Sequence, residues 1–212
     1  MTCEREQVVV VGAGPVLELC IAALTGPTVD ARSVIVDRVP GSGHDLRRLA
    51  EYPPDRWRAF AAVGNGLLNL LRLGLMSELR GAGYRLVRIV SPSASVPRDW
   101  QPGENTYVGD RTVIGPGVTV RHNAFIDAGA IIGPGVTIGH SVWIGAGVIL
   151  GAGASVGDGT IIAEGSILRD GIRIGRQCEL GIARTYRADV VDRTFYGDQF
   201  EGGVRIHSRE RT

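Results

Sequence analysis

The chain has 212 residues, a net charge of +1 at pH 7 and a hydrophobic content of 44%. A charge so close to balance gives no bulk attraction to nucleic acid or to an anionic membrane, and we expect neither partner. All basic residues are Arg, and the absence of Lys excludes a Schiff-base lysine, a pyridoxal-phosphate lysine and a P-loop lysine. The cysteines show no paired spacing, and no apolar run reaches membrane-spanning length. We therefore expect a cytoplasmic protein without a membrane span.

Residues 1–90 alternate between strand and helix patterns. A buried-strand run at residues 7–11 is followed by a glycine turn and a helical stretch at residues 16–24. Further strands are expected at residues 33–37 and 60–63, then a helix that ends near residue 80 and a fourth strand at residues 84–90. This βαββαβ order predicts a small Rossmann-like α/β domain, in which helices pack on a parallel sheet.

Small and polar residues follow the carboxyl ends of the expected strands, where an open parallel sheet binds its ligand. The candidate substrate-binding residues at this edge are Gly12, Gly14, Asp37, Gly64 and Asn65. The dinucleotide fingerprint GxGxxG is incomplete, because Leu17 takes the place of its third Gly and Pro15 lacks a backbone donor. The alternative is that the glycines only form tight turns and that Asp37 only caps a turn.

From residue 108 to residue 180 an aliphatic side chain recurs at every sixth position. The run is Val108, Ile114, Val120, Ile126, Ile132, Ile138, Ile144, Leu150, Val156, Ile162, Leu168, Ile174 and Leu180. A six-residue period fits neither a helix nor an ordinary strand, so it predicts a repeat architecture. We interpret it as an all-β, left-handed parallel β-helix with hexapeptide repeats, in which three repeats close one coil and the aliphatic side chains fill the axis.

The two patterns divide the chain into three parts. The Rossmann-like domain is assigned to residues 1–90, the β-helix to residues 91–183 and a C-terminal tail to residues 184–212. Counting back in sixes from Val108 gives Pro102 and Val96, so one imperfect coil is expected before the regular ones. Trp100 falls where a small inward residue belongs, and we expect it to cover the blunt end of the coil.

Two histidines fall in register on the expected β-helix. His122 and His140 each follow a core aliphatic by two residues and are one coil of eighteen residues apart. They should therefore stack on the outside of the coil about 5 Å apart, the spacing of paired strands. Neutral imidazole is a suitable general base near pH 7, although a stacked surface pair bonded to water is the alternative. No third His or Cys is in register, so we expect no metal.

The chain as a whole resembles the family of sialic-acid O-acetyltransferases and bacillosamine-type sugar N-acetyltransferases. The resemblance spans nearly all of residues 7–206 and combines a short Rossmann-like domain with a hexapeptide-repeat β-helix. Its landmarks are the VGAG turn at residues 11–14, the strand ending at Asp37, AVGN at residues 62–65, SPSA at residues 91–94, IGH at residues 138–140 and VDRTFYG at residues 191–197.

The resemblance implies an acyl-CoA-dependent acyltransferase, with acetyl-CoA as co-substrate, that acts on an amino or hydroxyl group of a nucleotide sugar or a related small metabolite. It implies a homotrimer with the active site between adjacent β-helices and the nucleotide in the N-terminal domain. His140 would take a proton from the acceptor, Ser141 would be its hydrogen-bond partner, and a backbone N–H of residues 151–153 would stabilise the oxyanion. Coenzyme A would run past Gly151, Gly153, Ala154 and Ala163.

Several positions differ from the family pattern, three of them on the β-helix beside the expected active site. Ser141 stands where an acid usually follows the catalytic His, Ile149 stands in place of a second His, and Gly133 stands in place of an Asn. Two alternatives therefore stay open. The chain could be a catalytically degenerate trimeric scaffold or regulatory protein, or the general base could be His122 instead of His140.

Overall fold

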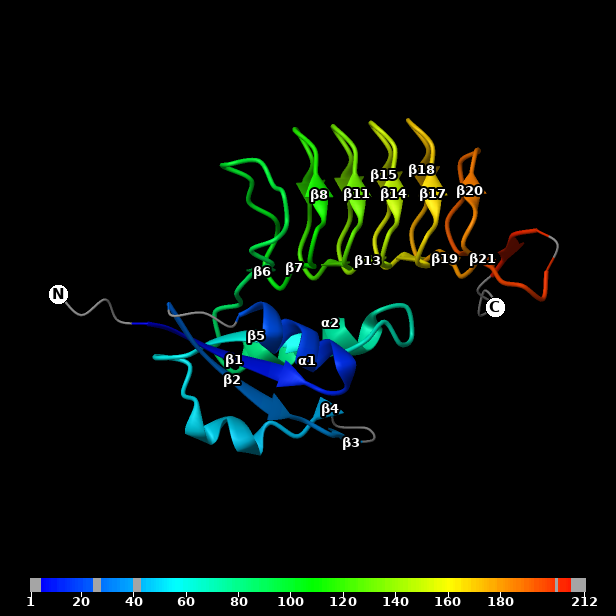
Figure 1. Cartoon of the computed structure of the whole chain (residues 1–212). Helices are drawn as coiled ribbons and strands as arrows, with labels where there is room; N and C mark the ends of the chain where they lie inside the picture. Colours follow the sequence, from blue (N-terminus) through cyan, green and yellow to red (C-terminus); the bar gives the residue numbers. More distant parts are fainter. Residues whose placement is uncertain (1–4, 25–27, 40–42, 201, 207–212) are drawn as a thin grey trace.

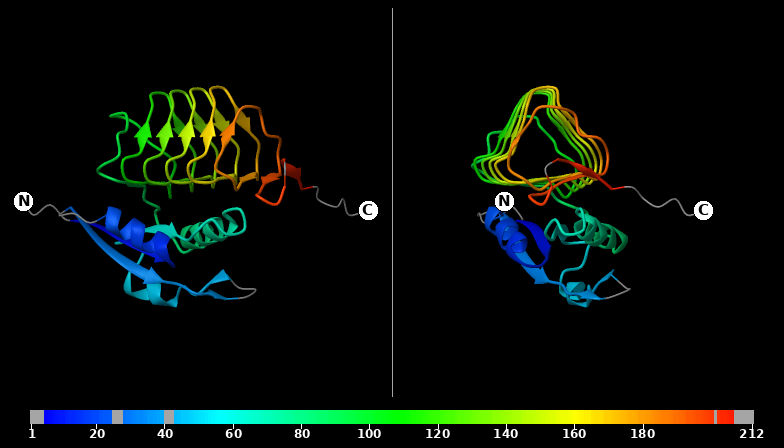
Figure 2. Two further views of the ribbon diagram at one scale, coloured as in Figure 1. Left: turned by 45° about the vertical axis from the view of Figure 1, so that its right-hand side comes forward. Right: turned by 90° about the vertical axis from the view of Figure 1, so that its right-hand side faces the viewer.

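The computed structural model describes residues 5–24, 28–39, 43–200 and 202–206. The chain forms a small α/β domain that lies along one side of a long coil (Figure 1). Viewed along its axis, the coil has a triangular outline, and the α/β domain lies against one of the three sides (Figure 2). The predicted combination of a Rossmann-like domain and a left-handed hexapeptide β-helix is confirmed.

The α/β domain is built on a parallel sheet of three strands in the order β2-β1-β5. The central strand β1 (Glu6–Gly12) carries the buried run Val8–Val11, as expected for a strand covered on both faces. It pairs with β2 (Val29–Ile35) on one side and β5 (Arg58–Ala62) on the other. β2 begins four residues earlier than the strand predicted at residues 33–37, because it pairs with β1 along its full length.

Two helices accompany the sheet. α1 (Pro15–Ala23) starts directly after Gly14, which adopts a φ of 68°, and Pro15 at its first turn needs no N–H partner. α2 (Leu70–Gly81) buries one stripe of side chains, namely Arg72, Leu75, Met76 and Leu79. Before α2, three successive non-glycine residues at positions 67–69 adopt φ values of 52°, 52° and 64°. Neither of these helices is long and apolar enough to cross a membrane, within the ranges that the structure describes.

Between β2 and β5 lie three short elements that the sequence did not predict. They are an antiparallel pair, β3 (Arg38–Val39) and β4 (Gly43–His44), and the 3-10 helix η1 (Arg47–Glu51).

The fourth strand predicted at residues 84–90 is wrong. Leu86 forms only a single bridge with Ala59, and the N-terminal sheet keeps three strands. The chain leaves the sheet at this point, because β6 (Ile89–Val90) pairs with the first strand of the coil, β7 (Tyr107–Val108). The first part of the apolar run at residues 84–90 thus contacts the N-terminal sheet, and its last two residues join a sheet of the coil.

From residue 107 to residue 186 the coil consists of strands of two residues, each six residues after the last and paired in parallel with the strand one coil away. The last two strands depart from this spacing, and they pair with each other antiparallel. The strands after β7 are β8 (Val113–Ile114), β9 (Thr119–Val120), β10 (Phe125–Ile126), β11 (Ile131–Ile132), β12 (Thr137–Ile138), β13 (Trp143–Ile144), β14 (Ile149–Leu150), β15 (Ser155–Val156), β16 (Ile161–Ile162), β17 (Ile167–Leu168), β18 (Arg173–Ile174), β19 (Glu179–Leu180), β20 (Thr185–Tyr186), β21 (Thr194–Tyr196) and β22 (Val204–Arg205). β20 and β21 pair with coil strands although they lie past residue 183. The division of the chain into domains stays a prediction.

All hexad aliphatics from Val108 to Leu180 are buried in one core cluster, as predicted. Small residues at the corners, such as Ala124, Ala130 and Cys178, belong to the same cluster. Trp100 packs against this core, and its indole N–H donates to the Val118 oxygen at 2.8 Å. This contact supports its expected role at the blunt end.

The outward positions give each flat side of the coil its own character. On the covered face, which packs on the α/β domain, Tyr107, Phe125 and Trp143 stack in sequence at centroid distances of 4.5 and 4.0 Å. On the apolar face, outward aliphatics occupy four successive coils at Val113, Ile131, Ile149 and Ile167. On the polar face, the same positions carry Thr119, Thr137, Ser155 and Arg173. An exposed apolar stripe of this kind is typical of an interaction surface.

Candidate functional site

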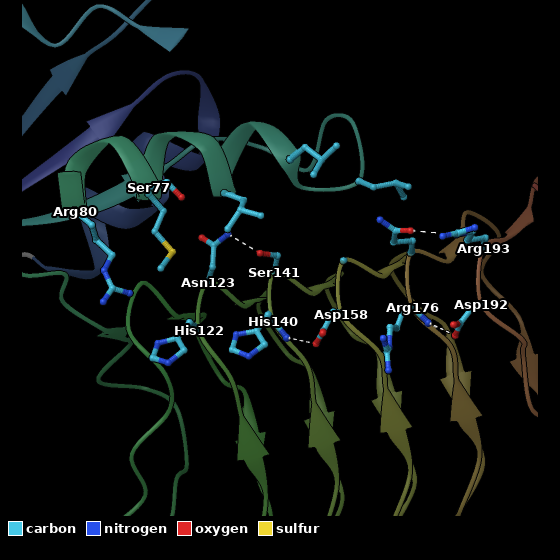
Figure 3. A pocket seen from close by; sticks show the side chains of 16 residues that line it. Ser77, Arg80, His122, Asn123, His140, Ser141, Asp158, Arg176, Asp192 and Arg193 are labelled. Carbon is cyan, nitrogen blue, oxygen red and sulfur yellow. Dashed lines mark hydrogen bonds between the residues drawn. The ribbon is translucent and has the colours of Figure 1, made fainter. Parts of the chain in front are cut away.

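The two histidines lie on one edge of the coil, which we call the histidine corner. It connects the polar face to the covered face and comprises residues 121–124, 139–142, 157–160 and 175–178. The His122 and His140 rings are parallel, with centroids 5.5 Å apart and planes at 10°. The predicted stacking, one coil apart on the outside, is thus observed, and Figure 3 shows both rings projecting from the same side of the corner.

The two imidazoles have different hydrogen bonds. The backbone N–H of Glu104 donates to Nδ1 of His122 at 3.0 Å. The backbone N–H of His140 donates to Oδ1 of Asp158 at 2.8 Å, whereas no described residue hydrogen-bonds to the His140 imidazole itself. His140 therefore offers a free ring nitrogen, and Asp158 holds the backbone from which that ring projects.

Ser141 is buried at 5% exposure and adopts a φ of 53°. The Nδ2 of Asn123 donates to its hydroxyl oxygen at 3.0 Å, and Asn105 donates in turn to Oδ1 of Asn123 at 2.8 Å. Among the described residues the Ser141 hydroxyl makes no bond to the His140 ring. The expected partnership of Ser141 with the His140 imidazole is therefore corrected: the left-handed corner turns this hydroxyl inward, and Ser141 supports the corner from within.

A buried arginine joins the α/β domain to this corner. Arg72 is 1% exposed and donates to the Asn123 backbone oxygen at 2.8 Å and to its Oδ1 at 3.3 Å. Its guanidinium lies 5.3 Å from the Trp143 ring centroid and 5.7 Å from that of Phe125. Burial lowers the pKa of Arg72 to about 9, so the side chain stays charged at neutral pH. The cation holds α2 against the coil.

A pocket of about 890 Å³ lies between α2 and the histidine corner. One wall is apolar and comes from α2 and the turn before it, with Leu68, Leu70, Leu73 and Met76. The opposite wall is polar and follows the corner from His122 and His140 through Asp158 and Arg176 to Asp192 and Arg193 (Figure 3). The structure thus brings His122, His140 and Ser141 together in one cavity that can hold an elongated ligand with polar and apolar parts.

The predicted substrate-binding residues gather elsewhere, at the carboxyl edge of the three-stranded sheet. Gly12 ends β1, Asp37 follows β2, and Gly64 and Asn65 follow β5. A Cβ on Gly12 would lie 1.8 Å from the Ala62 oxygen, so this glycine is required by strand packing. A Cβ on Gly14 or Gly64 would meet nothing within 4 Å, which leaves open space for a ligand. None of the five lines the pocket at the histidine corner.

The residues predicted to contact coenzyme A lie on the two other edges of the coil. Gly151, Gly153 and Ala154 follow β14, Ala163 follows β16, and none of them lines the histidine pocket. The Ala154 methyl is fully buried in the coil core. Its side chain is therefore not available to a ligand on the outer surface.

The oxyanion donor expected at residues 151–153 is corrected by the structure. The N–H groups of Gly151, Ala152 and Gly153 donate to Leu168 O, Asp170 Oδ1 and Pro134 O, respectively. All three donors are used within the coil. On the histidine corner, by contrast, the N–H of Asp158 has no acceptor among the described residues.

Sequence reasoning missed Asp158, Arg176, Arg72 and the α2 wall. Asp158 and Arg176 follow His140 by one and two coils, so the eighteen-residue register would have placed them on the same ladder. The i, i+3 spacing of Leu70 and Leu73, which continues to Met76, marks an apolar stripe on α2, but only the fold shows that it faces the histidines. Within the described ranges, no group of three or more His, Cys, Asp or Glu side chains is arranged to hold a metal ion.

The coil and its six-residue repeat are similar to those of the bacterial hexapeptide transferases. Residues 123–157 and 135–170 match the family of the bacterial transferase hexapeptide (six repeats). No curated protein matches the chain.

Solved structures match over both domains. PerB from Caulobacter crescentus, in complex with CoA and GDP-perosamine, is 27% identical with a TM-score of 0.78, over 89% of this chain and 92% of that chain. The acetyltransferase domain of PglB from Neisseria gonorrhoeae, in complex with acetyl coenzyme A, is 20% identical with a TM-score of 0.77, over 91% and 96%. These comparisons confirm the resemblance to sugar N-acetyltransferases and support an acetyl-CoA-dependent acyltransferase.

Proposed function

We propose that this chain transfers an acetyl group from acetyl-CoA to a nucleotide-linked amino sugar, with His140 as general base. One observation carries the proposal. The His140 imidazole, free of any hydrogen bond from a described residue, opens into the 890 Å³ pocket between α2 and the histidine corner. The PerB complex holds CoA and GDP-perosamine on the same two-domain fold, which supports this pair of substrates.

His140 performs a single proton relay in this proposal. Its free ring nitrogen accepts a proton from the acceptor amine as the amine nitrogen bonds to the thioester carbonyl carbon. The tetrahedral adduct then collapses, the C–S bond breaks, and His140 returns the proton to the leaving thiolate. The products are an amide and free coenzyme A, and the imidazole ends in its starting state.

Asp158 favours an amine over a hydroxyl as the acceptor. Its Oδ1 is bound by the His140 N–H at 2.8 Å, and its carboxylate lines the pocket beside the base. An amino sugar arrives mainly as an ammonium ion at neutral pH, and a nearby carboxylate attracts that charge. The ammonium group releases one proton to solvent before the free amine attacks, so the relay through His140 handles only the second proton. A neutral hydroxyl gains nothing comparable.

The nucleotide is proposed to bind at the carboxyl edge of the N-terminal sheet. Gly14 and Gly64 leave open space there, and Asp37 and Asn65 are exposed polar groups suited to ribose or base contacts. Gly12 is required for strand packing, so we no longer count it among the nucleotide-binding residues. The edge itself remains accessible to a ligand.

The active unit is proposed to be a homotrimer. On the apolar face of the single chain, the exposed fractions are 42% for Val113, 44% for Ile131 and 37% for Ile167. Apolar surface in contact with water is unfavourable in free energy, and burial against further copies removes this cost. In a ring of three copies, the apolar face of one copy packs on a different surface of the next. We propose that this surface lies beside the histidine corner, so that Gly151, Gly153 and Ala163, at the two edges of the apolar face, flank coenzyme A across the interface. This arrangement reconciles the expected coenzyme A residues with their distance from the histidine pocket.

The His140→Ala variant tests the proposal, with acetyl-CoA and a panel of GDP-, UDP- and CMP-linked amino and hydroxyl sugars. We expect turnover to fall by about 10²- to 10⁴-fold, the usual contribution of a general base. Acetyl-CoA binding by calorimetry and the solution mass should stay as in the wild type. An unchanged rate would remove His140 from the mechanism. A wild-type chain that binds no CoA would favour the scaffold or regulatory alternative.

A further inference from the structure

His122 is held in one tautomeric state by its backbone partner. The Glu104 N–H points at Nδ1 of His122 at 3.0 Å, so Nδ1 must keep its lone pair to accept this bond. A neutral imidazole has a single proton, which must then reside on Nε2. His122 therefore presents an N–H donor and no second acceptor.

This arrangement makes His122 unsuited to the role of general base. Removal of a proton from the acceptor would require the free Nε2 lone pair, which the Nε2–H tautomer lacks. Moving the proton to Nδ1 would break the bond from Glu104. His140, by contrast, has no described partner on its ring and can present an acceptor nitrogen. The stacked rings thus differ in chemistry although they are only one coil apart in sequence.

We propose that His122 is the hydrogen-bond donor to the thioester carbonyl oxygen, complementing His140 as acceptor on the attacking nitrogen. This inference rests on the proposed function. The ring centroids are 5.5 Å apart, and hydrogen bonds of about 2.9 Å from two such rings can converge on the nitrogen and oxygen of one tetrahedral carbon. Both imidazoles line the same pocket, so one reacting group can lie against both of them.

The donor acts where charge develops. As the nitrogen bonds to the carbonyl carbon, the C=O π pair moves onto oxygen, and Nε2–H of His122 stabilises that oxyanion without giving up its proton. When the pair returns to re-form C=O, the C–S bond breaks and the thiolate takes the proton held by His140. A donor fixed in advance by the Glu104 N–H needs no reorganisation during the reaction.

The test compares three substitutions at one position. His122→Gln keeps an N–H donor at a similar reach, His122→Glu has the same size but is an ionised acceptor, and His122→Ala has neither. We expect the Ala and Glu variants to lose about 10²-fold in kcat, with the KM for the acceptor changed less than about 3-fold. The Gln variant should recover at least 5-fold of the loss. Thermal unfolding and CoA binding show whether each variant is folded.

A second measurement does not depend on activity. The ¹⁵N chemical shifts of the His122 ring report its tautomer in the full chain, with His122→Gln used for assignment. A proton on Nε2 supports the inference, and a proton on Nδ1 overturns it. It is also overturned if kcat is unchanged in the Ala variant, if only KM rises, or if Gln is no better than Glu. A wild-type chain without transferase activity would defeat the proposed function, whereas the ring shifts would still decide the tautomer.

Discussion

The Arg72 guanidinium donates to the Asn123 backbone oxygen at 2.8 Å, and this bond ties α2 to the histidine corner. The contact joins residues that are 51 positions apart in sequence and belong to different domains. Its consequence is the pocket itself: Leu70, Leu73 and Met76 of the same helix form the wall that faces His140. The cavity therefore depends on a buried charge that does not itself line it.

Replacing Arg72 should cost stability. Arg72→Met removes the bonds to Asn123 and the contacts with the Phe125 and Trp143 rings, and we expect a loss of about 3 kcal/mol in the free energy of unfolding. Urea unfolding at pH 7 measures this loss. Arg80→Met on the same helix is the control, because its contact with Glu104 at 3.6 Å is exposed and should contribute under about 1 kcal/mol. Equal losses in the two variants would contradict the role of Arg72.

The β-helix could be predicted from the sequence because its order is local and periodic. Each coil repeats the same hexad environment, so Val108 and Leu180 obey one rule and their burial follows from position alone. The stacking of His122 on His140 follows from the same count. The failed strand at residues 84–90 shows the limit of this reasoning, since an apolar run does not reveal which of two sheets it joins.

The site could be predicted only where the repeat determines it. The register gives the neighbours of His140 along the corner, Asp158 among them, but not the wall of α2 opposite, which requires the docking of two domains. Nor could a sequence show that Ser141 turns inward to Asn123 or that the N–H of Glu104 binds His122, because both depend on backbone direction at a left-handed corner. The histidines in the sequence suggested acid–base chemistry, whereas the hydrogen-bond partners of Ser141 and His122 required the backbone geometry.

Neutralising Asp158 should weaken acceptor binding specifically. Asp158→Asn keeps an oxygen for the His140 N–H but loses the charge that attracts an ammonium group. We expect KM for an amino-sugar acceptor to rise about 3- to 10-fold, with little effect on a hydroxyl analogue, as measured by steady-state kinetics at pH 7. Asp170→Asn is the matched control, because Asp170 binds the Ala152 N–H in the same way on another corner. Equal effects of the two substitutions would show that the Asp158 carboxylate only stabilises the coil and does not attract the acceptor.

A charge on the apolar face should break the proposed trimer. Ile131→Asp places a carboxylate in the middle of the stripe, and burying it in an interface costs several kcal/mol. We expect light scattering to show single chains at micromolar concentration, with loss of activity. Leu19→Asp on α1 makes the same change at 43% exposure, close to the 44% of Ile131, and should leave the trimer intact. A trimeric Ile131→Asp variant would show that the copies pack through another face.

Stability should fall in alkali because of Cys20. Burial raises the pKa of this thiol from 9.0 to about 12, so the folded state keeps the proton that the unfolded state releases above pH 9. The contribution of Cys20 is fully present below pH 9 and is lost as the pH rises from 9 towards 12, at up to about 1.4 kcal/mol per pH unit. Urea unfolding of the wild type and of Cys20→Ala at pH 8, 9 and 10, with reductant, should give a flatter profile for the variant. Val16→Ala on the same helix removes buried carbon without a titrating group, and its profile should run parallel to the wild type at lower stability. A Cys20→Ala profile that also ran parallel would mean that the thiol ionises equally in both states.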